Sequence, residues 1–237
     1  MNEILDSIIK AAKSDISNPS ITIKVFIIDR IGFKEAHNLQ DKLQELRINN
    51  EISDIFLIVE HNPVYTITKH TNLSHLLFNE TMLKEKGIET ASVDRGGDIT
   101  YHGPGQIVGY PIINIKNYKL TVKTYVEAIE NTLIDALKTF EIESYIDPEA
   151  HGVWVKSRKI AALGIRISRY VTKHGFALNN TTDLSHFQGI VPCGLSKPVT
   201  SIQLETGKII HRETVTTRII ESMQKIFNVE CEIKQTC

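Results

Sequence analysis

Cysteine is scarce in this chain, with three residues among 237: Cys193, Cys231 and Cys237. An odd number of widely spaced cysteines argues against a disulfide framework and is typical of a protein in a reducing compartment. No C-x-x-C or H-x-x-x-H pairing brings metal ligands together, so no metal site is expected. Cys237 is the last residue and Cys231 lies in an alternating, strand-like stretch, which leaves Cys193 as the cysteine with unusual surroundings.

Long hydrophobic runs and an excess of charge are missing as well. The longest unbroken apolar run, Ile55 to Val59, is too short for a transmembrane helix. A net charge of −1 gives no general attraction to nucleic acid or to an anionic membrane, so neither is expected as a partner. The first residues, Met1 to Ile4, contain no basic region followed by an apolar block, as a secretory signal has. We expect a cytoplasmic protein, or one of an organelle matrix if a transit peptide was removed.

Hydrophobic periodicity predicts helices and strands interspersed along the chain, with the strands clustered in hairpin-like pairs. Helices are predicted at 3–13, 33–47, 122–140 and near 212–227. Strands are predicted at 21–28, 54–60, 89–94, 106–115, 143–146, 152–156, 159–169, 173–178 and near 228–233. The pattern favours an α+β (mixed α/β) fold with a mostly antiparallel or mixed central sheet, and no linker interrupts it, so residues 1–237 read as one domain. Thr121 is a plausible N-cap, and Pro111 is expected at a sheet edge or a bulge.

Residues 95–106 read Arg-Gly-Gly-Asp-Ile-Thr-Tyr-His-Gly-Pro-Gly-Gln and hold four of the chain's thirteen glycines. Glycine costs backbone entropy, so such a cluster indicates either a sharp turn or a close approach to the backbone. A hairpin with a polar tip and a substrate-binding loop both fit the composition. The spacing matches neither a Walker A loop nor a dinucleotide-binding fingerprint, which excludes the common phosphate loops.

Cys193 lies between Pro192 and Gly194, in a turn-like stretch that can expose its thiol. A free cysteine is commonly a small buried apolar residue, and that alternative stays open. A nucleophilic cysteine needs a nearby group that lowers its thiol pKa, and the sequence offers four candidates. These are Lys159, His174, His102 and Lys197.

Small apolar residues follow Lys159 in Ile160-Ala161-Ala162-Leu163-Gly164, and a similar run occurs in 174–179, His-Gly-Phe-Ala-Leu-Asn. The simplest interpretation of Lys159 is a solvent-exposed lysine at the edge of a strand, with no functional role. A wall of small residues is also what a narrow pocket for an alkyl chain requires. His61 and His151 fit a structural or a supporting role.

Taken together, these segments resemble the lipoyl(octanoyl) transferase family over about residues 25–200. The motifs that carry the resemblance are Glu60-His61-x-Pro63-Val64-Tyr65-Thr66, Arg95-Gly96-Gly97-x-x-Thr100-Tyr101-His102-x-Pro104-Gly105-Gln106, Arg158-Lys159-Ile160-Ala161-x-Leu163-Gly164, His174-Gly175-Phe176-Ala177-Leu178-Asn179 and Pro192-Cys193-Gly194. Several long motifs in the same order are far more specific than one glycine pattern. The family shares its fold with biotin- and lipoate-protein ligases, so the resemblance implies a domain of that type.

The resemblance implies an octanoyl transfer from octanoyl-acyl carrier protein to a lysine of a lipoyl domain, without ATP or another cofactor. It implies that Cys193 accepts the acyl group and that Lys159 lowers the pKa of its thiol. Lipoyl domains of 2-oxoacid dehydrogenases and the glycine cleavage H protein are the implied acceptors. The residues implied to line the acyl site are Arg95, Gly96, Gly97, Asp98, Ile99, Thr100, Tyr101, His102, Ala162, Leu163, Gly164, Gly175, Phe176 and Ala177.

Three alternatives remain: an ATP-dependent lipoate ligase of the same fold, a non-catalytic module that binds acyl groups or lipoyl domains, and a cysteine hydrolase. Cys193 argues against the ligase, which needs no thiol. The chain also departs from the family at Thr68, where a glycine is usual. That departure leaves open the shape of the loop after Thr66 and of the pocket mouth.

Overall fold

The computed structural model describes residues 2–13, 22–148, 150–191 and 198–234. Its helices are α1 (Asn2–Lys13), α2 (Phe33–Ile48), α3 (Glu80–Glu85), α4 (Val122–Lys138), α5 (Ile202–Thr206) and α6 (Arg212–Phe227), with short 3-10 helices η1 (Leu73–His75), η2 (Ile115–Tyr118) and η3 (Leu184–Gly189). Its strands are β1 (Thr22–Ile31), β2 (Ile55–His61), β3 (Val64–Thr68), β4 (Glu89–Val93), β5 (Thr100–His102), β6 (Gln106–Ile112), β7 (Tyr145–Ile146), β8 (Val153–Val155), β9 (Arg158–Ser168), β10 (Val171–Asn179) and β11 (Glu230–Lys234).

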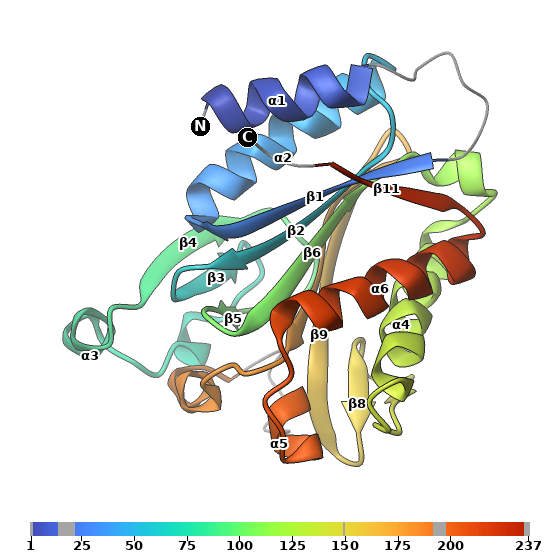
Figure 1. Ribbon diagram of the computed structural model, residues 1–237. Coiled ribbons are helices and arrows are strands. Elements are labelled where there is room, and N and C mark those ends of the chain that lie inside the picture. Colours follow the sequence, from blue (N-terminus) through green and yellow to red (C-terminus); the bar gives the residue numbers. More distant parts are fainter. Residues whose placement is uncertain (1, 14–21, 149, 192–197, 235–237) are drawn as a thin grey trace.

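Eight strands form a large mixed sheet in the order β11-β1-β2-β6-β10-β9-β8-β7. The strand β1 pairs in parallel with both β11 and β2, and the remaining neighbours are antiparallel. Helices α1 and α2 cover one face of this sheet, and α4 and α6 cover the other (Figure 1). The mixed α/β fold with a central sheet flanked by helices is therefore confirmed.

The central strands are buried on both faces because their side chains alternate between two apolar layers. In β2, Phe56 and Ile58 pack with the helices α4 and α6, whereas Leu57 and Val59 pack with α1 and α2. A run of consecutive apolar residues, rather than an alternating pattern, is what such a strand requires. The run from Ile55 to Val59 is explained by this position.

A second sheet, in the order β4-β3-β5, projects to one side of the large sheet (Figure 1). Its own apolar cluster contains the buried side chains of Tyr65, Ile99 and Tyr101, with Phe78 and Phe187 packed against them. Tyr65 and Tyr101 stand opposite each other in the β3–β5 pair. The glycine-rich residues 95–99 connect β4 to β5, so this small sheet carries them.

Two local predictions have different outcomes. Thr121 is the N-cap of α4, where its hydroxyl and that of Thr124 form a capping box, as predicted. The expectation for Pro111 is wrong, because Pro111 lies in the central strand β6 and pairs with Phe56 without a register shift. The proline is tolerated there because the ladder from β6 to β10 ends at the pair Gly109–Phe176, before Pro111 is reached.

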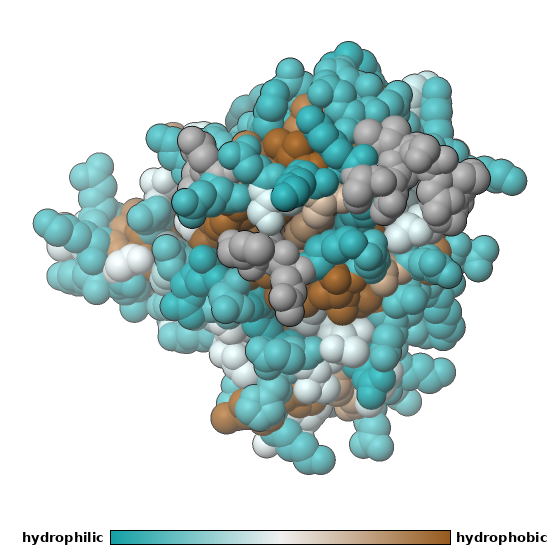
Figure 2. All heavy atoms as spheres, turned by 45° about the horizontal axis from the view of Figure 1, so that its top comes forward, coloured by the Kyte–Doolittle hydropathy of each residue, from teal (hydrophilic) through white to brown (hydrophobic). Residues whose placement is uncertain are grey.

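The face in Figure 2 is covered mostly by hydrophilic residues, with hydrophobic ones in several separate patches. Scattered patches of this kind are normal for a globular protein. None of the helices in the described ranges combines the length and the hydrophobicity needed to cross a membrane.

Candidate active site

A pocket lies between the large sheet and residues 95–102, which lead into and form strand β5 of the small sheet. Strands β6, β9 and β10 form its wall on the large sheet. Its lining residues are Phe33, Arg95, Gly97, Asp98, Ile99, Thr100, His102, Gln106, Val108, Tyr110, Lys159, Ala162, Leu163, Gly164, His174, Gly175, Phe176, Ala177, Asn179, Phe187 and Val199. Small and apolar side chains dominate this set, which suits an alkyl chain better than a charged ligand.

Arg95 closes one side of the pocket by lying against the backbone of β9. Its guanidinium donates to the carbonyl of Gly96 at 3.0 Å and to the hydroxyl of Thr66 at 2.8 Å. A Cβ atom at Gly164 would come within 2.6 Å of Arg95 Cδ. The glycine therefore allows the arginine stem to rest directly on the strand, which is a close approach that any other residue would obstruct.

Gly97 adopts φ +85°, a left-handed conformation that favours glycine, and its carbonyl accepts a 3.0 Å hydrogen bond from the hydroxyl of Thr68. Thr68 is buried at the end of β3, and its backbone N–H donates a hydrogen bond to the hydroxyl of Thr71. The residue that departs from the family pattern thus ties the end of β3 to the glycine stretch. The hydrogen bonds of Thr68 therefore fix the shape of the loop that follows β3, which the sequence left open.

The deep end of the pocket is formed by buried aromatic and histidine side chains. His61 Nδ1 lies 2.9 Å from the carbonyl of Ile31, so Nδ1 donates there and Nε2 accepts from the Tyr110 hydroxyl at 2.7 Å. Burial lowers the pKa of His61 to about 4, which keeps it neutral. The ring of Phe33 stacks on His102, with centroids 6.0 Å apart and planes 9° apart. His61 is accordingly a structural support for Tyr110.

A chain of hydrogen bonds crosses the pocket wall from His102 to Lys159. Gln106 Oε1 accepts from His102 Nδ1 at 2.8 Å, and Gln106 Nε2 donates to Asn179 Oδ1 at 2.9 Å. Asn179 Nδ2 donates to the carbonyl of Thr200 at 2.9 Å. The backbone N–H of Thr200 in turn donates to the carbonyl of Lys159 at 2.9 Å. Every link is a paired buried polar group, so this wall is rigid.

Lys159 lies at the start of β9 and lines the pocket. Its Nζ atom donates to the carbonyl of His151 at 2.9 Å and lies 4.8 Å from the centre of the Trp154 ring. Burial lowers the pKa of His102 to about 3 and that of His174 to about 4, so neither is charged at neutral pH. Of the predicted partners for the thiol that the structure describes, Lys159 alone brings a positive charge.

Cys193 and Lys197 fall outside the described residues. The described chain on either side of them contacts the pocket region: the N–H of Val191 donates to the carbonyl of His75 at 2.8 Å, and the N–H of Lys159 donates to the carbonyl of Pro198 at 2.9 Å. Cys231, by contrast, is half-buried in β11, and burial raises its thiol pKa to about 12. A thiol with that pKa is unreactive at neutral pH.

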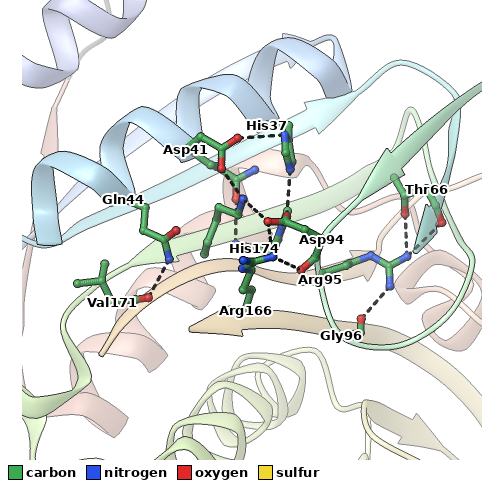
Figure 3. A network of polar contacts seen from close by, with 12 residues as sticks. His37, Asp41, Gln44, Thr66, Asp94, Arg95, Gly96, Arg166, Val171 and His174 are labelled. Carbon is green, nitrogen blue, oxygen red and sulfur yellow. Dashed lines mark hydrogen bonds and ion pairs between the residues drawn. The ribbon is translucent and has the colours of Figure 1, made fainter. Parts of the chain in front are cut away.

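Asp94 joins the two sides of the pocket in a network of polar contacts (Figure 3). His174 Nε2 and His37 Nε2 contact Asp94 Oδ1 at 2.8 and 3.1 Å, and Lys173 Nζ and Arg166 Nη1 contact Oδ2 at 2.9 and 2.8 Å. Burial by itself raises the pKa of this carboxyl, but the hydrogen bonds from His174, Lys173 and His37 outweigh it and hold the pKa well below its usual value.

Among the described residues, His37, Asp94 and His174 also offer ligand atoms within 4.8 Å of one another, close enough to share a metal ion. Lys173 and Arg166 bring two positive charges to the same carboxylate. A further cation would be repelled by them, and each oxygen of Asp94 is already hydrogen-bonded. The donor set fits a structural network better than a metal centre.

Residues 33–224 match the family described as "Lipoyl protein ligase A/B catalytic domain". A protein named "Octanoyltransferase" from Solibacter usitatus is 44% identical over 203 residues, covering 86% of this chain and 92% of that protein. Another of the same name, from Desulforamulus reducens, is 39% identical over 215 residues, covering 89% and 94%. The chain belongs to this family, and within it to the octanoyltransferases.

Solved structures agree with the family at the level of the fold. A lipoate-protein ligase A bound with ATP superposes with a TM-score of 0.74 at 11% identity, covering 90% of this chain and 89% of that one. A biotin protein ligase from Aquifex aeolicus gives a TM-score of 0.54 at 12% identity, covering 86% and 70%. The fold is thus shared across both kinds of ligase.

In this octanoyltransferase family member, most residues expected at the acyl site surround one pocket. Gly96 and Tyr101 do not line it: the Gly96 N–H donates to the carbonyl of Ile165 at 3.1 Å, and the Tyr101 ring faces His186 and Phe187 within the small sheet's cluster. The sequence interpretation missed several lining residues, namely Phe33, Val108, Tyr110, Phe187 and Val199. For Val108 and Tyr110 a signal existed, because they alternate with Gln106 along one strand.

Proposed function

We propose that this chain transfers an octanoyl group from octanoyl-acyl carrier protein to the target lysine of a lipoyl domain, through an octanoyl-Cys193 thioester. The observation that carries the proposal is a narrow apolar pocket with Lys159 at one end, in a chain 44% identical to a protein named octanoyltransferase. A pocket of small residues suits an alkyl chain, and a lysine at its end suits an anionic sulfur.

The reaction proceeds in two displacements at the same carbonyl carbon. In the first, the Cys193 thiolate attacks the carrier thioester; a new C–S bond forms, the old one breaks, and the carrier leaves as a thiolate that takes up a proton. In the second, the lysine amine attacks the acyl-cysteine; a C–N bond forms, the Cys193 thiolate leaves, and one proton of the amine is released. Each thioester is already activated, so ATP is not consumed.

Lys159 promotes both steps by favouring the thiolate over the thiol, since a nearby ammonium stabilises negative charge on sulfur. Its backbone supports this role: both its N–H and its carbonyl are hydrogen-bonded to the chain at Pro198 and Thr200. The developing oxyanion needs fixed donors, and backbone N–H groups next to the glycines of the pocket are our candidates for them.

The acyl chain lies, in this proposal, along the residues implied by the family resemblance, with Arg95 to His102 on one side and Ala162 to Gly164 and Gly175 to Ala177 on the other. Lipoyl domains of 2-oxoacid dehydrogenases and the glycine cleavage H protein serve as acceptors. The reaction takes place in the cytoplasm, and residues 1–237 act as one catalytic domain.

The decisive experiment is intact-mass analysis of the protein after it is mixed with octanoyl-acyl carrier protein in the absence of ATP. We expect an octanoyl adduct that a lipoyl domain removes, with the acyl group appearing on the acceptor lysine. If no adduct forms without ATP, the chain is a ligase or a binding module. If the adduct disappears equally fast without any acceptor, it is a hydrolase. Either result would overturn the proposal.

A further inference from the structure

The lining residues of the pocket form successive levels along three paired strands. At one end, Asn179 of β10 pairs with Gln106 of β6. In the middle, Ala177 pairs with both Val108 and Ala162, and further along Gly175 pairs with Gly164. Lys159 is at the end that holds Asn179, and Tyr110 follows Val108 toward the end that holds Gly175. The pocket therefore has a defined direction, from Lys159 toward Tyr110.

Three buried side chains, Phe33, Tyr110 and His174, stand at the end remote from Lys159, with 4%, 3% and 2% of their surfaces exposed. We call them the end wall. The rings of Tyr110 and His174 meet edge to face, with centroids 6.4 Å apart. Each is held from behind, Tyr110 by the His61 ring and His174 by the Asp94 carboxylate.

The side chains behind the end wall are polar and hydrogen-bonded to one another, so displacing the wall would cost free energy. His174 Nε2 and Lys173 Nζ contact Asp94 at 2.8 and 2.9 Å, and Lys173 also pairs with Asp41 of helix α2 (Figure 3). Moving His174 outward would break buried hydrogen bonds to an ionised group. An apolar end made of leucine or methionine side chains would yield to a longer ligand, whereas this one is fixed.

The span of the pocket suits a medium-length chain. From Lys159 to Gly164 the strand β9 advances five residues, or about 17 Å at the usual rise per residue. An extended eight-carbon thioester covers roughly 10 Å, at about 1.2 Å per bond, which leaves room for the side chains at the reacting end. A twelve-carbon chain needs roughly 14 Å, which leaves too little of this distance for the side chains at the reacting end.

We propose that the end wall sets the upper limit of acyl-chain length in this protein, and that Asp94 is the positioning residue that keeps the wall in place. This inference rests on the proposed acyl transfer. Phe33, Tyr110 and His174 select against chains longer than the pocket, because each surplus methylene must displace a side chain that is held from behind. In a fitted pocket, a single methylene changes the specificity constant by roughly tenfold or more.

The test measures kcat/KM for transfer to one lipoyl domain from carrier proteins loaded with acyl chains of six, eight, ten, twelve and fourteen carbons. For the unmodified protein we expect a maximum at eight carbons and a value at twelve at least tenfold lower. In Tyr110→Ala the ratio of the twelve-carbon to the eight-carbon value rises at least tenfold. The matched control Tyr170→Ala removes an exposed tyrosine far along the β9–β10 hairpin and leaves the ratio unchanged.

Three further variants test the proposal if Tyr110→Ala folds poorly. Tyr110→Leu shortens the side chain while it keeps an apolar core residue, and it raises the same ratio to a smaller extent. Ala162→Val narrows the middle of the pocket at a partly buried position, and it raises the six-carbon value relative to the eight-carbon value. Asp94→Asn weakens the backing and raises the twelve-to-eight ratio about threefold, an effect that a loss of stability alone does not produce.

The outcomes separate the two proposals. If the unmodified protein transfers no acyl group from any donor, the proposed function fails. If it transfers octanoyl groups but Tyr110→Ala and Tyr110→Leu keep the unmodified chain-length profile, the end wall does not set the limit. A profile of Asp94→Asn equal to that of the unmodified protein removes Asp94 as the positioning residue.

Discussion

The two faces of the large sheet are built in different ways. On the face covered by α4 and α6, large aliphatic and aromatic side chains such as Leu133 and Phe176 fill one continuous apolar cluster. On the opposite face, α2 packs over β6 and β10, and beyond it the side chains shrink to Ala162, Gly164 and Ala177. Histidines and charged groups that are hydrogen-bonded to one another replace the aliphatic layer there.

This difference shows how one sheet serves stability and function separately. The first face gains its free energy from close packing of apolar surface. The second face gives up packing volume to create a pocket and keeps its shape through polar contacts such as His61–Tyr110 and Asp94–His174. Substitutions on the two faces should consequently have different signatures.

The largest effect is expected at Cys193. Cys193→Ala removes the only atom in our mechanism that forms the acyl-enzyme bond, so transfer should fall by roughly a thousandfold or more. The same substitution at Cys231, in the remote strand β11, should leave transfer near its original rate. Mass analysis and acceptor acylation measure both. Octanoylation by Cys193→Ala at the original rate would disprove the thioester mechanism.

Acidification should lower the free energy of unfolding through the buried histidines of the pocket face, rather than through the face covered by α4 and α6. Burial lowers the pKa values of His61, His102 and His174 to about 4, 3 and 4, whereas in the unfolded chain they titrate near 6.5. Between these values only the unfolded chain binds the protons, so the free energy of unfolding decreases as the pH falls from about 6.5 toward 4. From pH 7 to pH 5 the loss should be about 2 kcal/mol for each histidine.

Urea unfolding at the two pH values measures this slope. His61→Gln should reduce the pH dependence by about one histidine's share. Equal stability at pH 7 and pH 5 would show that these histidines are not buried in the neutral form.

A cavity on the opposite face should reduce stability alone. Leu133 of α4 is fully buried, and Leu133→Ala should lower the free energy of unfolding by about 3 kcal/mol. Below the unfolding transition, kcat/KM for octanoyl transfer should remain unchanged, since Leu133 itself does not line the pocket. A changed chain-length profile in this variant would mean that the two faces are coupled.

The smallest effect is expected at Lys159, whose charge we propose favours the Cys193 thiolate. Lys159→Ala should raise the thiol pKa toward the unperturbed value near 8.5 and slow acylation by roughly ten- to a hundredfold. Lys156→Ala, at an exposed position in the same hairpin, is the matched control. The rate of thiol alkylation as a function of pH reports the change, and an identical profile in Lys159→Ala would remove the proposed role.

Local patterns were sufficient for most of the fold and insufficient for the contacts between elements. The long elements were located by a continuous apolar run, as in β2, or by helical spacing of apolar residues, as in α4. The short helix α5 was missed, since five residues carry too little periodicity. Pro111 was misplaced because its tolerance depends on where the ladder to β10 ends, which is a property of the partner strand.

The site was predictable where one segment carries the signal. The glycine stretch, Lys159 and the small residues after it stand out in the sequence, and they meet at one pocket. Phe33 and Asp94 carried no such signal, because each acts on residues far along the chain: Phe33 on His102, and Asp94 on His174. A single sequence does not report which distant side chains pack together.

The contact between Arg95 and Gly164 has a pharmacological consequence. Because the arginine stem rests on the bare backbone of Gly164 and its guanidinium is hydrogen-bonded to Gly96 and Thr66, the two walls of the pocket are tied together at that point. A rigid, flat inhibitor would lose little conformational entropy on entering the pocket beside this contact, whereas a flexible alkyl chain must be straightened. Thin aromatic scaffolds, rather than fatty-acid mimics, are therefore the better starting compounds against enzymes with this pocket.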